Sequence, residues 1–329
     1  MKQLYIIGNG FDIHHDIPSR YSNYQEWLKD NDEELLNRLR DFYNVDDKKW
    51  WNQFEKELGY PDMDDYINEI AFENQPDYGS DDFHDRDYYA GQFAAEIEIG
   101  DLFDSIKETF ANWVASLPAP QSCKKIRMDK NDAFFINFNY TNTLQTLYNI
   151  SYDKILFIHG NSVTDKDLVL GHNRPYEELN NEFSPDSPNP PASLKENELE
   201  EWFDENSDNG EDFIHQSVRE EVVNQVYKLR KDTQSIINDN QKFFETLKDV
   251  QTIYIYGFSF SPIDLPYLSK IVSEVVIKTT KWIVSYYSDG DIENAKKFFE
   301  ESNISLSQVS YIKLNDLLLV KQLELRFEE

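Results

Sequence analysis

Short apolar runs that end at a glycine or a polar residue alternate along the chain with longer stretches of helical spacing. Such runs are typical of buried strands, and apolar residues recurring every three or four positions are typical of amphipathic helices. Strands are predicted at 3–7, 133–138, 154–158, 168–170, 252–256, 282–287 and 309–312. Helices after residue 210 are predicted at 214–248, 262–277, 292–299 and 315–325. This alternation predicts an α/β, Rossmann-like fold with a mostly parallel sheet flanked by helices.

The stretch between the first two strands shows helical spacing and no strand pattern, so we interpret 31–129 as a large helical insertion. The other predicted domain is a Rossmann-like core formed by 1–30 and 130–329. Within that core, 174–212 contains 13 acidic residues, two basic residues and five prolines. Such a composition buries little apolar surface, so it predicts an acidic surface loop.

Charge and composition narrow the classes of function. The chain has 329 residues with 62 acidic and 32 basic side chains, a formal net charge of −30. This charge argues against binding to nucleic acid and to anionic membranes, both of which need clustered basic residues. No apolar run approaches the roughly 20 residues that span a bilayer, and the N-terminus does not resemble a signal peptide. With Cys123 as its single cysteine, we expect a cytoplasmic protein without disulfides or a thiolate metal site.

The most prominent candidate motif, Gly8-Asn9-Gly10-Phe11-Asp12, directly follows the first predicted strand. Glycine permits a sharp turn and a close approach to a ligand, and a following helix N-terminus attracts phosphate. The third glycine of the dinucleotide fingerprint is missing, so a structural turn and a phosphate cradle are both open. We expect Asp12 to cap or brace the turn. His15 is either a ligand contact or a hydrogen-bonded buried histidine.

Polar residues also follow the next predicted strands. In open α/β sheets, ligands bind at the carboxyl ends of the strands, which makes Asn139 and His159 candidates for chemistry. We expect Asn139 to face the site, and Thr141 or Asn142 to cap the next helix. The imidazole of His159, with an ordinary pKa near ~6.5, can exchange protons at neutral pH, and Gly160 leaves space beside it.

Two later segments add candidates. His172 follows a predicted strand. Arg174 is a cation for pyrophosphate or, more simply, forms a surface salt bridge with Glu177 or Glu178. In Gly257-Phe258-Ser259 the glycine permits close approach and the serine offers a hydroxyl, while Ser261 and Pro262 form a good helix start. The sequence lacks a nucleophile elbow, a P-loop and a zinc-ligand pattern, so serine hydrolase, P-loop and zinc chemistry have no support.

The order of these segments resembles the AbiH family of bacteriophage abortive-infection proteins. The segments, in chain order, are LYIIGNGFDIHHDIPSRY, FNYTNTL, IHGN, LGH and YIYGFSFSPID. The same order is similar to the sirtuin-like NAD-hydrolysing domains of antiphage defence. That resemblance implies a catalytic asparagine at Asn139 and a catalytic histidine at His159. The expected dinucleotide contacts are Gly8, Asn9, Gly10, Phe11, Asp12, His15, Arg20, Tyr140, Thr141, Gly160, His172, Gly257, Ser259 and Asp264.

The resemblance implies an enzyme that hydrolyses the N-glycosidic bond of NAD or a related nucleotide. NAD is then a substrate, and neither a prosthetic cofactor nor a metal is expected. Phe138 and Thr141 depart from the sirtuin pattern on either side of the asparagine. These departures motivate an alternative hypothesis, a non-catalytic sensor of nucleotide or ADP-ribose. A third hypothesis is an acidic protein that binds a basic partner. The expected partner is a dinucleotide, and a homo-oligomer or a phage-derived trigger stays open.

Overall fold

The computed structural model describes residues 2–43, 45, 48–77, 79–161, 168–183 and 213–319. The chain divides into two compact units, each built from segments that are distant in sequence. Unit 1 consists of Met1–Asn31, Lys107–Leu170 and Lys231–Glu329, and unit 2 of Asp32–Ile106 and Gly171–Arg230. Compared with the predicted domains, residues 107–129 therefore fall with the sheet, and 171–230 fall with the helical segment.

Unit 1 contains a sheet of six strands that all run parallel, as the alternating pattern predicted. Its strands are β1 (Lys2–Ile7), β2 (Ala133–Asn137), β3 (Ile155–Phe157), β4 (Val250–Tyr256), β5 (Lys281–Ser285) and β6 (Val309–Ile312). The order β3-β2-β1-β4-β5-β6 matches that of doubly wound Rossmann sheets. The predicted strand at 168–170 is wrong, because this segment is not part of any strand.

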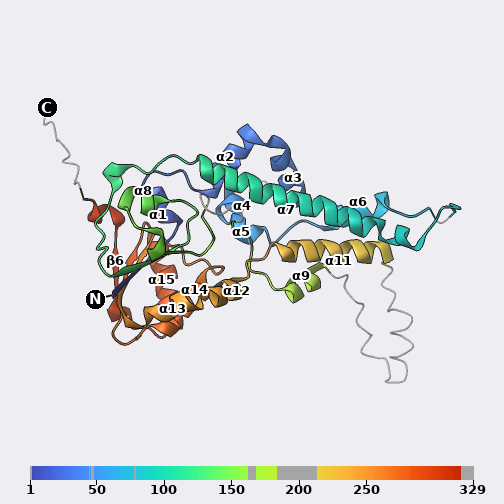
Figure 1. Ribbon diagram of the computed structural model, residues 1–329. Helices are drawn as coiled ribbons and strands as arrows, with labels where there is room; N and C mark the ends of the chain where they lie inside the picture. Colours follow the sequence, from blue (N-terminus) through green and yellow to red (C-terminus); the bar gives the residue numbers. More distant parts are fainter. Residues whose placement is uncertain are drawn as a thin grey trace, which may run out of the picture. The chain divides into compact units, whose positions relative to one another are not determined.

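Both faces of the sheet are buried, as expected when helices cover each side of parallel strands. Alternate residues of β1 point to opposite faces: Leu4 and Ile6 belong to one apolar core, Tyr5 and Ile7 to the other. The first core includes side chains from α12 (Thr233–Asp239), α13 (Gln241–Glu245), α14 (Leu265–Glu274) and α15 (Asp289–Glu301). The second includes side chains from α1 (Asn9–His14) and α8 (Thr143–Tyr148). Figure 1 shows these two groups of helices on either side of the strands.

Two helix predictions in unit 1 differ from the structure. The helix predicted from Pro262 begins instead at Leu265, because a turn in which Ser261 O accepts the N–H groups of Asp264 and Leu265 precedes it. The helix predicted at 315–325 is a single 3-10 turn, η6 (Leu314–Leu317), that ends before Leu318; residues from 320 lie outside the described part. The remaining elements of this unit are α2 (Tyr21–Asn31), the last part of α7 (Ala90–Ser116), η2 (Ser122–Lys124), η3 (Tyr152–Lys154), η4 (Thr246–Asp249) and η5 (Leu306–Gln308).

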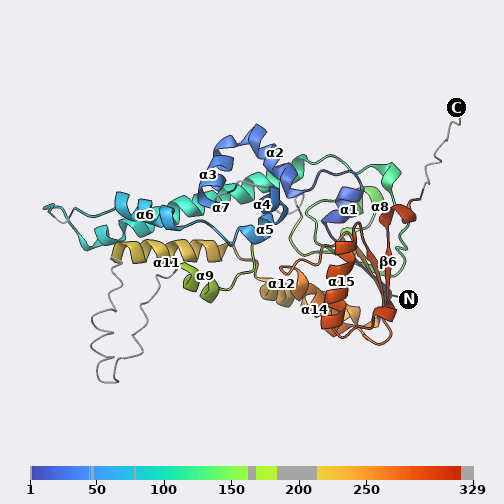
Figure 2. The ribbon, with the colours of Figure 1, turned by 180° about the vertical axis from the view of Figure 1, so that it is seen from behind.

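Unit 2 is helical throughout its described elements. They are α3 (Glu33–Tyr43), α4 (Lys48–Asn52), α5 (Phe54–Glu57), α6 (Asp64–Glu73), η1 (Asp85–Tyr89), α9 (Tyr176–Phe183), α11 (Phe213–Lys228) and the first part of α7 (Ala90–Ser116). Helix α11 runs beside this part of α7 in both views (Figures 1 and 2), and Gly91 of α7 allows Val218 of α11 to approach.

Helix α9 occupies the start of the predicted acidic loop at 174–212, so the loop prediction is wrong for 176–183. The rest of that prediction, 184–212, lies outside the described residues. Across the described chain, no helix combines the length and the apolar composition that crossing a membrane requires.

Candidate functional site

The carboxyl ends of β1, β2 and β4 are joined by hydrogen bonds at one edge of the sheet. Gly8 N donates to Tyr256 O (2.9 Å), and Gly10 N donates to Gly257 O (2.8 Å). The side-chain amide of Asn139, two residues beyond β2, donates to Gly8 O (3.1 Å). Three segments that are far apart in sequence therefore meet at the switch point of the sheet, where open α/β proteins bind ligands.

Glycines make this meeting possible, because the backbones touch. A Cβ on Gly10 would lie 2.8 Å from Gly257 Cα, and one on Gly257 would lie 2.0 Å from Phe11 N. Gly257 also has φ +64°, which favours glycine. Since the N–H groups of Gly8, Gly10 and Phe11 all donate to backbone carbonyls, this turn closes the switch point with its own main chain.

Asp12 braces the turn, as the sequence predicted. Its buried carboxylate accepts hydrogen bonds of 2.6 Å from the hydroxyls of both Thr141 and Thr143. Burial raises the pKa of Asp12 to about 6, although the hydrogen bonds from Thr141, Thr143 and Asn139 favour the ionised form. The β1 turn is thereby tied to the segment that follows β2.

His15 is a buried, fully hydrogen-bonded histidine. Its Nδ1 lies 2.6 Å from Phe11 O, which only accepts, so the proton is on Nδ1. Its Nε2 accepts from Tyr148 Oη at 2.8 Å. Burial lowers the pKa of His15 to about 4, so the ring is neutral at pH 7. The sequence leaves two roles open for His15, a ligand contact or a hydrogen-bonded buried histidine, and these contacts match the second role.

Asn139 presents an unused acceptor inside the protein. The residue is 5 % exposed, and its Nδ2 is engaged by Gly8 O. Its Oδ1 is buried and has no hydrogen-bond partner. A buried amide oxygen in this state costs free energy unless a ligand or water completes it. Asn139 can therefore accept one further hydrogen bond from a hydroxyl group.

His159, directly beyond β3, lies beside the Asn139 segment in a buried polar cluster. Its ring, 3 % exposed, packs against Phe138 and Tyr140, with centroid distances of 5.6 and 5.9 Å. Its Nδ1 lies 3.3 Å from Phe138 O. Its Nε2 lies 3.4 Å from both Asp264 Oδ1 and Lys231 Nζ. Nε2 of His159 therefore lies between the side chains of an acidic residue, Asp264, and a basic residue, Lys231.

Asp264 and Lys231 carry the charges of the cluster around His159. Although burial opposes ionisation of Asp264, the positive charge of Lys231 holds the pKa of this carboxyl below its ordinary value. Asp264 also occupies the N-cap position of α14, yet its side chain makes no capping hydrogen bond. Its carboxylate therefore serves the cluster around His159 and not the helix.

The other predicted contacts of unit 1 differ in their exposure. Asn9 and Arg20 are exposed, and Asn9 is hydrogen-bonded to both the backbone and the hydroxyl of Ser19, which fixes the start of the Arg20 segment beside the turn. Ser259 is exposed two residues beyond Gly257. Tyr140 Oη donates to Val169 O (3.0 Å), and Gly160 has φ +82°. Asn142 caps α8 by position, but its amide oxygen accepts from Asn161.

His172 belongs to unit 2, whereas the other predicted site residues belong to unit 1. Its Nε2 lies 2.8 Å from Val226 O, and its Nδ1 accepts from Arg174 N at 3.1 Å. Burial lowers its pKa to about 4. Both ring nitrogens are occupied by the backbone, so the contacts of His172 are structural.

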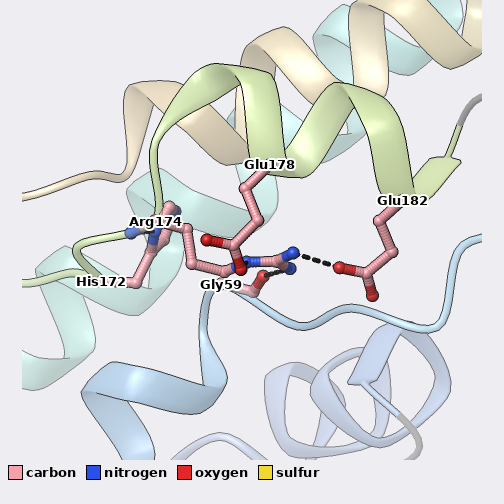
Figure 3. A network of polar contacts seen from close by, with 5 residues as sticks. All are labelled: Gly59, His172, Arg174, Glu178 and Glu182. Atoms are coloured by element: carbon pink, nitrogen blue, oxygen red, sulfur yellow. Dashed lines mark hydrogen bonds and ion pairs between the residues drawn. The ribbon is translucent and has the colours of Figure 1, made fainter.

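Arg174 forms the buried ionic centre of unit 2 (Figure 3). Its guanidinium is 4 % exposed, pairs with Glu178 and Glu182 of α9, and donates to Gly59 O at 2.6 Å. The glutamate pairing was predicted, but as a surface contact. The group is buried because it connects α9 to the Gly59 turn.

The match to a family model decides the identity of the chain. The model for bacteriophage abortive infection AbiH matches residues 4–286. The chain belongs to the AbiH family. AbiH membership supports a role in abortive infection and antiviral defence, and the matched range includes every residue of the sheet-edge site in this AbiH protein. Searches of curated proteins and of solved structures gave no match.

Sequence reasoning missed two residues of the AbiH site. Ser285 ends β5, and its hydroxyl accepts from Gly257 N at 2.8 Å; extending the strand-end argument to β5 could have found it. Lys231 lies between α11 and α12, outside any strand end. No local pattern signals that this lysine is buried, because its partners come from residues 159 and 264.

Proposed function

We propose that this AbiH protein hydrolyses the N-glycosidic bond of NAD or a related dinucleotide during abortive infection. The observation that carries the proposal is that two buried polar side chains lie beyond the carboxyl ends of the neighbouring strands β2 and β3. Asn139 offers an unpartnered amide oxygen, and His159 offers an imidazole with an acid beside it. Both follow strands of a sheet in the Rossmann order, where nucleotides are commonly held.

The chemistry needs an oriented water and a proton acceptor. Water attacks C1′ of the nicotinamide ribose as the glycosidic bond breaks, and nicotinamide leaves with the bonding electron pair as a neutral molecule. Asn139 Oδ1 accepts a hydrogen bond from this water or a ribose hydroxyl, and Nε2 of His159 takes the proton. The carboxylate of Asp264, 3.4 Å away, offsets the resulting positive charge. A positioned base of this kind contributes about 10²–10⁴-fold to rate.

Contacts to the rest of the dinucleotide come from exposed side chains in this proposal. The backbone N–H groups of Gly8, Gly10 and Phe11 are already engaged, so they are not available to a pyrophosphate. Arg20 offers a guanidinium beside the turn, and Asn9 and Ser259 offer polar groups next to it. Guanidinium groups suit phosphate recognition because their donors match pairs of phosphate oxygens.

Access requires movement. Asn139 and His159 are 5 % and 3 % exposed, so a nicotinamide ribose reaches them only after covering segments shift. Such opening steps are common in enzymes that exclude water from the reaction. We therefore expect activity to depend on an additional factor, and the assay includes extract from phage-infected cells.

The direct test measures free nicotinamide after incubation of purified protein with NAD, with and without that extract. Asn139→Ala and His159→Asn are each expected to lower turnover by about 10²-fold or more. Matched controls are Asn37→Ala and His84→Asn, both at exposed positions of unit 2, which should retain turnover. The proposal fails if the wild-type protein releases no nicotinamide under either condition.

A second candidate function is a nucleotide or ADP-ribose sensor. The side chains on either side of Asn139 in the sirtuin comparison have structural contacts here. Phe138 packs in the core against Phe258, and Thr141 binds Asp12. Calorimetry separates the candidates, because a sensor binds NAD or ADP-ribose without releasing nicotinamide.

A further inference from the structure

Lys231 is a deeply buried charged residue beside the proposed site. It is 1 % exposed and lies immediately before α12, with Nζ 3.4 Å from Nε2 of His159. Burying an ammonium is costly unless it is compensated. The proposed hydrolysis uses Asn139, His159 and Asp264 but assigns no role to this lysine.

We propose that Lys231 is a positioning residue that keeps His159 neutral, with its proton on Nδ1 and its lone pair on Nε2. The hydrogen-bonding groups around the ring favour this form. Asp264 Oδ1 also lies 3.4 Å from Nε2, but it has no hydrogen-bond partner in the described part of the chain, as expected if Nε2 carries no proton. Phe138 O, 3.3 Å from Nδ1, is a carbonyl and can only accept. An ammonium can only donate, so Lys231 directs one N–H toward Nε2.

The charges around the ring favour the same form. Lys231 and Asp264 carry opposite charges, so a neutral imidazole adds no charge to this pair. A protonated ring would bring a second positive charge to within 3.4 Å of the ammonium. Among the described residues, the rings of Phe138, Tyr140 and Tyr267 also pack against His159, at centroid distances of 5.6, 5.9 and 6.0 Å. None of these rings carries a charge that would stabilise an imidazolium.

The catalytic meaning of this inference rests on the proposed function, whereas the protonation state does not. A general base must be neutral, with its lone pair on the atom that receives the proton. Lys231 holds Nε2 in that state until water takes its place, and Asp264 then remains beside the new imidazolium. Without the ammonium, the carboxylate of Asp264 would draw a proton onto Nε2, and the base would be lost.

The test reads the histidine ring directly by NMR. In protein labelled with ¹⁵N-histidine, long-range ¹H–¹⁵N spectra at pH 7.5 distinguish the two neutral tautomers from the imidazolium, and His159→Asn assigns the signals. In the wild type we expect a proton on Nδ1 only. In Lys231→Met, a neutral side chain of similar length, we expect a proton on Nε2. Lys231→Arg keeps the charge and should retain the wild-type pattern.

Lys248→Met, at an exposed position of unit 1, is the matched control and should leave the His159 signals unchanged. The inference is overturned if wild-type His159 carries its proton on Nε2 or is an imidazolium, a result that stands even if Lys231→Met does not fold. An unchanged ring in folded Lys231→Met also overturns it. If NAD is hydrolysed, Lys231→Met should lower turnover at least about tenfold. Absence of hydrolysis would contradict the proposed function alone.

Discussion

Asp12 shows how a single buried acid couples the structure to pH. The folded protein raises the pKa of this carboxyl from 3.8 to about 6, because burial disfavours the charge. The folded state therefore binds a proton more tightly than the unfolded chain does. The stabilisation that protonated Asp12 gives to the folded state is fully present below about pH 4, and it is lost as the pH rises through about 6.

We expect Asp12→Asn to remove this dependence. Relative to the variant, the free energy of unfolding of the wild type should fall by up to about 3 kcal/mol between pH 4 and pH 7. Urea denaturation across this range measures the difference. His15 and His172, with pKa values lowered to about 4, lose stability as the pH falls below about 6.5. This histidine effect is the same in the wild type and in Asp12→Asn, so the difference between their free energies of unfolding reports on Asp12 alone. Parallel pH profiles of the two proteins would contradict the prediction.

The residues of the candidate site differ in how well the sequence predicts their location. Asn139, His159 and Asp264 could be selected because each follows closely after an apolar strand. Lys231 could not, since its environment is created by residues that fold back from 72 and 33 positions away. Burial of a charge depends on such long-range partners, which no local pattern records.

At the scale of elements, the glycine contact between the β1 and β4 turns sets the spacing of the sheet edge. Gly257→Ala places a methyl group 2.0 Å from Phe11 N at a φ of +64°. We expect it to lower the free energy of unfolding by about 3 kcal/mol or more. Gly290→Ala in α15 is the control, because its nearest neighbour is 3.7 Å away, and it should stabilise by up to ~1 kcal/mol. Chemical denaturation compares them, and equal effects would contradict the prediction.

The elements of the sheet were predictable because parallel strands buried on both faces appear as continuous apolar runs. The same logic failed at 168–170. Leu168 and Leu170 are buried like strand residues, so composition alone cannot separate this segment from a strand. The start of α14 was misplaced for a related reason: Ser261 and Pro262 suit a helix start, yet a turn containing Phe260 at φ +56° precedes it.

At the scale of the whole molecule, the two units have separate stabilising centres. We expect Arg174→Met to destabilise unit 2 by about 1–3 kcal/mol, because it leaves the buried Gly59 O without its donor. The carboxylates of Glu178 and Glu182, 51 % and 45 % exposed, remain solvated and add little to this cost. Arg38→Met removes an exposed ion pair with Asp101 and should cost less than about 1 kcal/mol.

Hydrogen-exchange mass spectrometry locates the effect of Arg174→Met. Exchange should accelerate in α9 and α11 while β1 and β4 keep their protection. Equal acceleration in the strands would show that the two units do not respond separately. The extent of unit 2 was beyond sequence reasoning, since contacts such as Gly91 with Val218 join segments more than 100 residues apart.

The bridge between His172 and Arg230 has a consequence for how this architecture can diversify. His172 and Arg230 lie at the two ends of the 171–230 segment, so the chain enters and leaves this segment at neighbouring positions. A change in the number of residues between these two ends does not change the distance between the ends themselves. Relatives could thus differ widely in this segment and still present the lysine that follows it.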